Sequence, residues 1–283
     1  MTRPLVDIHP HVISPDESRY PKAPLGGTPS KWSQDRPVDW EELAAAMDAA
    51  GVAKAAVVQS STTYGHDNSY LADCVDRARR RITGVCSVGF MDDDAIQQME
   101  YWIGDRGMSG VRLFTTGSTM GQSGWLDDAK TKPAWAYAAE RRIPVCVQLT
   151  VPALPQLENV LKEFPGLCVI LDHVAMTPFT DGPPYAAAEP VYGLARFEGV
   201  NLKVTSRTLL SGKASIGGSS GVVRDLIGHF GSDRIAWGSN YPANEGTLSS
   251  LVSLLEEATA GLRDADAVNV YSSTALRLYP KLA

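Results

Sequence analysis

Three of the five histidines in the chain stand where short apolar segments end. His9 and His11 belong to the run Asp7-Ile8-His9-Pro10-His11, and His173 closes the run Leu171-Asp172-His173. Alternate residues of an extended segment face the same side, so His9 and His11 are expected to point together. An imidazole can accept a proton, donate a hydrogen bond or ligate a metal ion. The three are therefore candidates for catalysis or for metal binding.

A further candidate is Asn240, in the run Ile235-Ala236-Trp237-Gly238-Ser239-Asn240-Tyr241-Pro242. This run indicates a short buried strand that breaks at Gly238 and presents Asn240 in a turn. A carboxylate at such a place accepts a proton, whereas an amide forms hydrogen bonds but has no useful basicity. Asn240 is thus a candidate for chemistry, although an amide cannot act as a base.

Arg112 lies inside an apolar segment, residues 110–114. A buried guanidinium needs an anionic partner, which is either a structural carboxylate or an acidic group on a substrate. Other polar side chains near the ends of apolar segments are weaker candidates for substrate binding: Tyr64, His66, Gln148 and Arg207.

Short β-branched runs alternate with longer amphipathic stretches along the whole chain, which is typical of repeated strand–helix units. Eight runs are expected as strands: residues 5–9, 53–59, 82–88, 110–114, 144–149, 168–173, 200–205 and 234–238. The expected helices are residues 40–50, 68–80, 95–106, 133–141, 154–163, 191–197 and 221–230, with a last helical region from 247 onward.

Eight parallel strands, each followed by a helix, predict a single α/β domain over residues 1–283, folded as a (β/α)8 TIM-type barrel. A doubly wound open sheet is the alternative, disfavoured by the eight similar repeats and the lack of a GxGxxG run. Sites of such barrels lie at the C-terminal ends of the strands, where the long loops at 13–37 and 177–189 are also expected.

Composition narrows the class of protein. The 283 residues are 44% hydrophobic and 20% charged, and the net charge of −6 argues against a nucleic-acid surface. No apolar run is long enough for a membrane span, and the N-terminal residues do not resemble a signal peptide. The four cysteines form no CxxC pair and are expected to be free thiols in the cytoplasm. Acidic barrels often self-associate, so a homo-oligomer is also among the expectations.

In order along the chain, these runs resemble the amidohydrolase superfamily, in the lactonase branch that includes 2-pyrone-4,6-dicarboxylate hydrolase and sugar-lactone hydrolases. The runs that carry the resemblance are Asp7-Ile8-His9-Pro10-His11, Tyr64-Gly65-His66-Asp67-Asn68, Gly110-Val111-Arg112-Leu113, Asp172-His173, Phe230-Gly231-Ser232-Asp233-Arg234, Trp237-Gly238-Ser239-Asn240-Tyr241-Pro242 and Ala275-Leu276-Arg277-Leu278-Tyr279. The resemblance implies a barrel in which water attacks a lactone carbonyl, polarised by histidines, arginines or a metal.

In the family pattern position 240 holds an aspartate that acts as the general base. Three interpretations of Asn240 follow from the resemblance. The chain is an inactivated form in which the aspartate was exchanged for its amide, or a natural enzyme that uses another base such as His173 or one of the paired histidines. The third interpretation is a ligand-binding protein that has lost the chemistry.

The resemblance also bears on the cofactor. Metal-dependent branches usually carry a histidine after strand five, where this chain has Gln148. His9, His11 and His173 would still suffice for one zinc ion, so zinc-dependent and metal-free catalysis are both expected outcomes. The pyrone-dicarboxylate branch tends to have an arginine just past the strand-six histidine, and Val174 in this place suggests fewer or differently placed anionic groups on the substrate.

The predicted function is hydrolysis of a small acidic lactone, in the breakdown of aromatic compounds or sugar acids. The residue at 240 would be the base, His9, His11 and His173 would stabilise the oxyanion, and Arg112 with Arg207 would bind an acidic group. The alternatives are a metal-dependent nonoxidative decarboxylase of the same superfamily and the ligand-binding protein.

Overall fold

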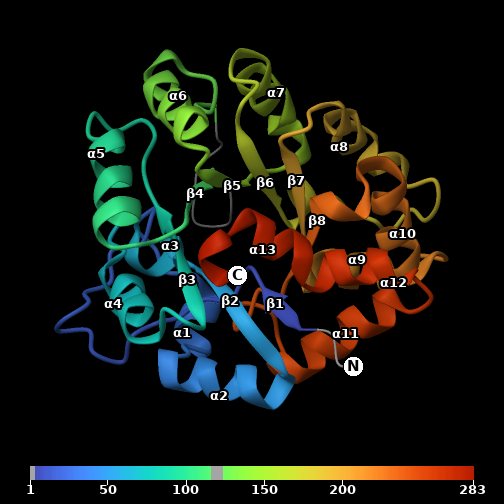
Figure 1. Ribbon diagram of the computed structural model, residues 1–283, viewed down its shortest axis with the longest axis horizontal. Helices are drawn as coiled ribbons and strands as arrows, with labels where there is room; N and C mark the ends of the chain where they lie inside the picture. Colours follow the sequence, from blue (N-terminus) through green and yellow to red (C-terminus); the bar gives the residue numbers. More distant parts are fainter. Residues whose placement is uncertain (1–3, 116–123) are drawn as a thin grey trace.

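Eight parallel strands form one sheet in sequence order, from β1 to β8 (Figure 1). The computed structural model describes residues 4–115 and 124–283. Each strand pairs with the next along the chain, and the last meets the first where the Ile8 amide donates to the Trp237 carbonyl at 3.1 Å. The sheet therefore curls into a nearly closed barrel with the helices around it, which confirms the predicted (β/α)8 fold.

The strands are β1 (Leu5–Asp7), β2 (Val52–Val58), β3 (Ile82–Ser87), β4 (Gly110–Phe114), β5 (Pro144–Gln148), β6 (Cys168–Asp172), β7 (Val200–Thr205) and β8 (Ile235–Gly238). The helices are α1 (Lys31–Asp35), α2 (Trp40–Ala50), α3 (Ser61–Tyr64), α4 (Ser69–Ala78), α5 (Ala95–Met99), α6 (Lys132–Arg141), α7 (Leu154–Glu163), α8 (Glu189–Tyr192), α9 (Ser206–Lys213), α10 (Gly218–Phe230), α11 (Leu248–Thr259), α12 (Asp264–Val268) and α13 (Thr274–Leu278). Within the described ranges, none of these helices has both the length and the apolar character that crossing a membrane requires.

The predicted strand over 5–9 is too long, because β1 ends at Asp7. The Asp7 carboxylate accepts the His9 amide at 2.9 Å and the Ser239 amide at 2.8 Å. Where the barrel closes, the Asp7 side chain thus accepts hydrogen bonds from backbone amides that a strand partner would otherwise accept. Pro10 has no N–H with which to extend the strand. His9 and His11 consequently lie beyond the strand, and strand alternation was the wrong reason to place them together. The short helices α1, α3 and α9 were not predicted.

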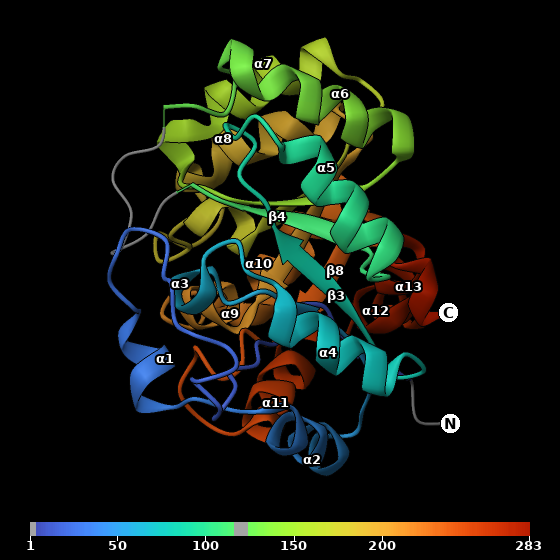
Figure 2. The same ribbon diagram turned by 90° about the vertical axis from the view of Figure 1, so that its left-hand side faces the viewer.

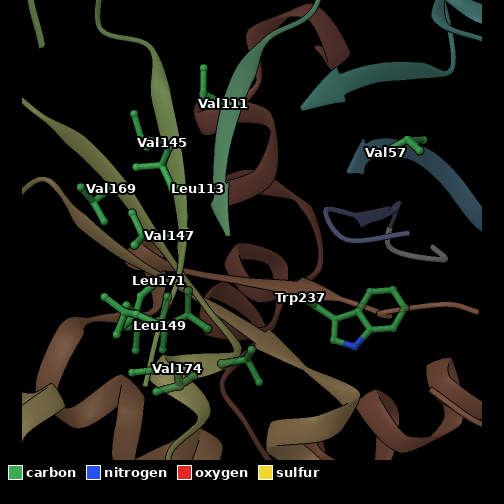
Figure 3. Close-up of a cluster of buried hydrophobic side chains, with 14 of the residues drawn as sticks. Val57, Val111, Leu113, Val145, Val147, Leu149, Val169, Leu171, Val174 and Trp237 are labelled. Atoms are coloured by element: carbon green, nitrogen blue, oxygen red, sulfur yellow. The ribbon is translucent and has the colours of Figure 1, made fainter. Parts of the chain in front are cut away.

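Alternation along the strands divides the barrel into an outer and an inner layer of side chains. On β4, β5 and β6 the odd-numbered residues are apolar and pack under the helices, among them Val111, Val145 and Val169 (Figure 3). The even-numbered residues between them face inward and include Arg112, Gln148 and Asp172. The two-residue alternation of the strands therefore places apolar side chains under the helices and polar side chains inside the barrel.

The C-terminal segment closes one end of the barrel. Ala275, Leu278 and Tyr279 pack with inward-facing residues of the strands, and the Tyr279 hydroxyl lies 3.3 Å from Cys146 Sγ. Figure 1 shows α13 at the centre of the ring of strands, and Figure 2 shows α1 and α3 on the opposite side from α13. The end with α1 and α3, where the strands finish, is therefore the end at which a site can open.

Candidate active site

A pocket of about 360 Å³ opens at the C-terminal ends of the strands. The predicted site residues that line it are His11, Arg112, Gln148, His173, Arg207 and Asn240. Trp32 of α1 and the residues Ser61 and Thr62 of α3 complete its walls. The unpredicted short helices therefore form part of the site, as does the long first loop.

The three candidate histidines form one cluster. The His9 ring centroid lies 5.0 Å from that of His11 and 4.8 Å from that of His173, with both pairs edge to face. Gly238 makes this placement possible, because a Cβ at that position would lie 2.5 Å from the His9 Cβ. The glycine that ends β8 is thus required by the close approach of His9.

A buried ionic network lies against the histidines. Arg112 Nε donates to Asp172 Oδ2 at 2.9 Å, and Lys203 Nζ lies 2.8 Å from Asp172 Oδ1. Arg112 also donates to Gln148 Oε1 at 2.5 Å, and Lys203 donates to His9 Nδ1 at 2.9 Å. Four neighbouring strands and the segment after β1 each contribute one side chain, so the network spans the barrel mouth.

The network carries two cations and one carboxylate. Burial raises the pKa of Asp172, but Lys203 and Arg112 together outweigh burial and hold that pKa well below its usual range. Asp172 is therefore ionised, and these three groups together carry one net positive charge, which the nearby buried Asp7 carboxyl partly offsets. Such a surplus favours an anion or a developing oxyanion at this place.

All three histidines are neutral at neutral pH. Burial and the charge of Arg112 lower the pKa of His11 and of His173 to about 3, against the opposing effect of Asp172. Burial followed by the charge of Lys203 holds the pKa of His9 well below its usual range. Neutral imidazoles can each present one N–H donor and one lone pair, and their partners decide which nitrogen does which.

Asn240 lies in the left-handed region with φ of 57°, which asparagine tolerates better than most residues. Its backbone carbonyl accepts the Asn244 amide at 2.8 Å, and its side-chain Nδ2 donates to Asn244 Oδ1 at 2.9 Å. Asn244 Nδ2 is buried and has no partner among the described residues. A carboxylate at 240 would supply an acceptor for that amide, so the turn is compatible with an aspartate.

Two of the predicted substrate-binding residues lie away from the pocket lining. The Tyr64 hydroxyl accepts the Ser14 amide at 2.8 Å and is buried, while His66 Nδ1 lies 3.0 Å from Ser87 Oγ. Both side chains anchor loops. Arg207, at the start of α9, is exposed at the pocket, and no carboxylate of the described residues forms an ion pair with it.

Lys203 is the site residue that sequence reasoning undervalued. It is fully buried in the apolar strand β7, and it lies beside Asp172 in the register of β6 and β7. The sequence pattern is the same as for Arg112: a cationic side chain lies inside an apolar strand, and such a cation needs an anionic partner. The ring of Trp32, from the long first loop, stacks on His11 with centroids 5.3 Å apart.

Polar groups gather at the C-terminal ends of the strands, which is where (β/α)8-barrel enzymes have their active sites. The family model described as Amidohydrolase matches residues 6–281, and the chain belongs to this family. It is 26% identical over 209 residues to an L-fucono-1,5-lactonase of Burkholderia ambifaria, covering 74% of this chain and 70% of the relative.

Solved structures share the whole fold. A protein proposed to be a 2-pyrone-4,6-dicarboxylic acid hydrolase from Pseudomonas putida superimposes with a TM-score of 0.81 at 21% identity, with both chains fully covered. An amidohydrolase from Burkholderia multivorans with bound Zn gives 0.76 at 17% identity, covering 98% of this chain and 99% of the other. These structures, and decarboxylases that share the barrel, are under 25% identical and show the fold alone.

The residues present do not fit a zinc ion held by the three histidines. Lys203 donates to His9 Nδ1, so the neutral ring carries its proton on Nε2 and offers a metal no lone pair. Gln148 and Asn240 are neutral amides where metal sites need anionic or imidazole ligands. Within the described ranges, no three histidine, cysteine or acidic side chains are placed to hold a metal.

Treatment with a chelator is therefore expected to leave any activity of the purified protein unchanged. The check is an assay before and after dialysis against a chelator, with the metal content measured on the same samples. If zinc and activity were lost in proportion and both returned on adding zinc, the conclusion that these residues do not fit a zinc ion would be wrong.

Proposed function

We propose that the protein hydrolyses a small lactone that carries an acidic group. The observation that carries this proposal is the cluster of three neutral imidazoles beside the buried Arg112–Asp172–Lys203 network, two of which, His11 and His173, line the pocket of an amidohydrolase barrel. Hydrolysis of an ester needs donors for the carbonyl oxygen and an acceptor for the proton of water, and neutral imidazoles supply both.

The charges of the pocket favour an acidic substrate. Arg207 is exposed at the rim without an ionic partner among the described residues, so it is available to a carboxylate. Arg112 is engaged with Asp172 and Gln148, and it acts on the substrate mainly through the surplus positive charge. Arg112 and Arg207 were both expected to bind the acidic group of the substrate. Arg207 is the better placed of the two to contact that group directly.

The relative from Burkholderia ambifaria supports lactone hydrolysis, since its name describes opening of a sugar lactone. Decarboxylation, the alternative within the superfamily, was expected to need a tightly held metal. The His9–Lys203 contact disfavours such a metal, so hydrolysis is the better supported of the two reactions.

A panel of lactones, with and without a carboxylate, tests the function by proton release. Acidic lactones are expected to react with a lower KM than neutral ones of the same ring size. Arg207→Met should raise KM for the acidic lactones by roughly tenfold or more, because a hydrogen bond to a charged group contributes about 1.5–3 kcal/mol.

A matched control is Arg224→Met, which removes an exposed arginine of α10 outside the pocket lining and should leave both KM values unchanged. Release of CO2 from hydroxybenzoates, with no lactone opened, would replace the proposal with decarboxylation. Tight binding of lactones with no turnover in any variant would instead favour the ligand-binding protein.

A further inference from the structure

Lys203 has a fully defined set of partners inside the barrel. Its ammonium group has three N–H donors and no lone pair. Nζ lies 2.8 Å from Asp172 Oδ1, 2.9 Å from His9 Nδ1 and 3.3 Å from Cys146 Sγ. The contact with Asp172 is an ion pair, and the hydrogen bonds of the ammonium group go to His9 and Cys146. His9 Nδ1 must be an acceptor, and the neutral ring carries its hydrogen on Nε2.

His11 is held in the opposite tautomer. Its Nδ1 lies 2.8 Å from the carbonyl oxygen of Val58, which can only accept. Nδ1 therefore carries the hydrogen and Nε2 has a free lone pair. The side chain lines the pocket, and Trp32 stacks on its ring and fixes its orientation.

His9 Nε2 is a donor that the described residues leave without a partner. The atom is buried, and no group in the described part of the chain accepts its hydrogen. Leaving such a donor unpaired is costly, so an unpaired one in a site marks a place for a ligand acceptor. His9 itself does not line the pocket, but its ring contacts both His11 and His173, the two imidazoles that do, so a ligand oxygen reaches Nε2 only by entering beside them.

We propose that His9 and His11 act as a matched donor and acceptor, His9 stabilising the oxyanion and His11 removing the proton from water, with Lys203 as the positioning residue that fixes His9 as the donor. This inference rests on the proposed lactone hydrolysis and adds which group does what. It also names a proton acceptor in a chain whose residue 240 is an amide.

The reaction balances with these two groups. His11 Nε2 takes a proton from water as the water oxygen bonds to the lactone carbonyl carbon. The π electrons of the carbonyl move to its oxygen, which accepts a hydrogen bond from His9 Nε2. When the tetrahedral intermediate collapses, the bond from carbon to the ring oxygen breaks, and the ring oxygen takes the proton from His11. The products are one hydroxy acid and the regenerated neutral imidazole.

Neighbouring groups are less suited to the role of His11. Asn240 has no basic atom, and His173 Nδ1 faces the Thr205 hydroxyl at 2.8 Å, which can donate or accept and leaves the tautomer open. The pKa of His11, lowered to about 3 mainly by burial, keeps its lone pair free at neutral pH. The same low pKa makes it a weak base, so turnover is expected to be slow.

Nitrogen NMR of protein labelled with 15N-histidine tests the tautomers without any substrate. The chain has only five histidines, so single substitutions to glutamine assign the signals. His9 is expected as the Nε2–H form and His11 as the Nδ1–H form. Lys203→Met should change the His9 signals and leave those of His11 in place. His9 in the Nδ1–H form, or His11 in the Nε2–H form, in the unsubstituted protein would overturn the proposal, even if Lys203→Met does not fold.

Kinetics then test the role of His11. His11→Gln should lower lactone hydrolysis by about 10²-fold or more in the chain with Asn240, and by less in an Asn240→Asp background that has its own base. His229→Gln, on the exposed face of α10, is the control and should change neither. Equal losses in both backgrounds would refute His11 as the acceptor. If no lactone reacts at all, the proposed function fails, and the tautomers still decide the assignment of donor and acceptor.

Discussion

Replacing Asn240 with aspartate is expected to raise the rate of lactone hydrolysis by about 10²–10⁴-fold, the usual contribution of a positioned general base. The residue lies in a left-handed turn at the end of β8 and lines the pocket together with His11 and His173. A carboxylate there has the size of the amide but can accept the proton of water. It also meets Asn244, whose buried Nδ2 lacks an acceptor among the described residues.

The measurement is kcat and kcat/KM for both forms on the same lactone, followed by proton release. The gain should appear mainly in kcat, since the amide and the carboxylate fill the same space in the bound state. Asn159→Asp, on the outer helix α7, adds the same charge outside the pocket and is expected to give no gain. An unchanged rate in Asn240→Asp on every acidic lactone that binds would mean that position 240 is not the site of a base.

Lowering the pH from 7 to 5 is expected to reduce the free energy of unfolding by about 3 kcal/mol or more. Folding lowers the pKa of His9, His11 and His173, chiefly through burial. The stability that depends on their neutral form is complete above about pH 6.5 and is lost as the pH falls toward 3, because the unfolded chain binds protons that the folded chain refuses. His11 and His173 each contribute about 2 kcal/mol of this loss by pH 5, and His9 adds a loss in the same direction.

Asp7 acts in the opposite direction and makes the decline shallower. Burial raises its pKa to about 6, against the hydrogen bonds from Ser239 and His9. Between pH 6 and its ordinary pKa the folded chain binds a proton that the unfolded chain does not, so Asp7 returns about 1 kcal/mol by pH 5. The net change stays large because three imidazoles outnumber one carboxyl.

Urea denaturation at pH 7, 6 and 5 measures this loss, with the slope of unfolding free energy against pH giving the number of protons taken up. His11→Gln removes one of the three imidazoles, so the slope should fall by about one proton. A free energy of unfolding that stays constant between pH 7 and 5 would show that the imidazoles are not held neutral by burial.

The barrel was predictable because its signals are local. The apolar runs of β4 and β7 and the helices α2 and α7 were predicted with the bounds that the structure has, since each follows from periodicity within a few residues. The C-terminal ends of the strands meet in any such barrel, so the pocket could be located and most of its lining named.

The connections between the site residues were not predictable in the same way. Sequence alone left open whether Arg112 would meet a carboxylate of the protein or of a substrate, and the structure gives it Asp172 from two strands away. The His9–Lys203 contact joins residues 194 positions apart, and it decides the tautomer. Tyr64 and His66 could not be excluded from the pocket, because a loop direction depends on packing that no local pattern records.

The surplus positive charge of the Arg112–Asp172–Lys203 network has a kinetic consequence. Opening a lactone creates a new carboxylate at the place where the carbonyl was, next to the two cations that share one carboxylate. The hydroxy acid is therefore expected to bind more tightly than the lactone from which it forms, so it inhibits the reaction as it accumulates. This inhibition is expected to be stronger with Asn240 than in the Asn240→Asp form, because a carboxylate at 240 repels the new carboxylate of the product.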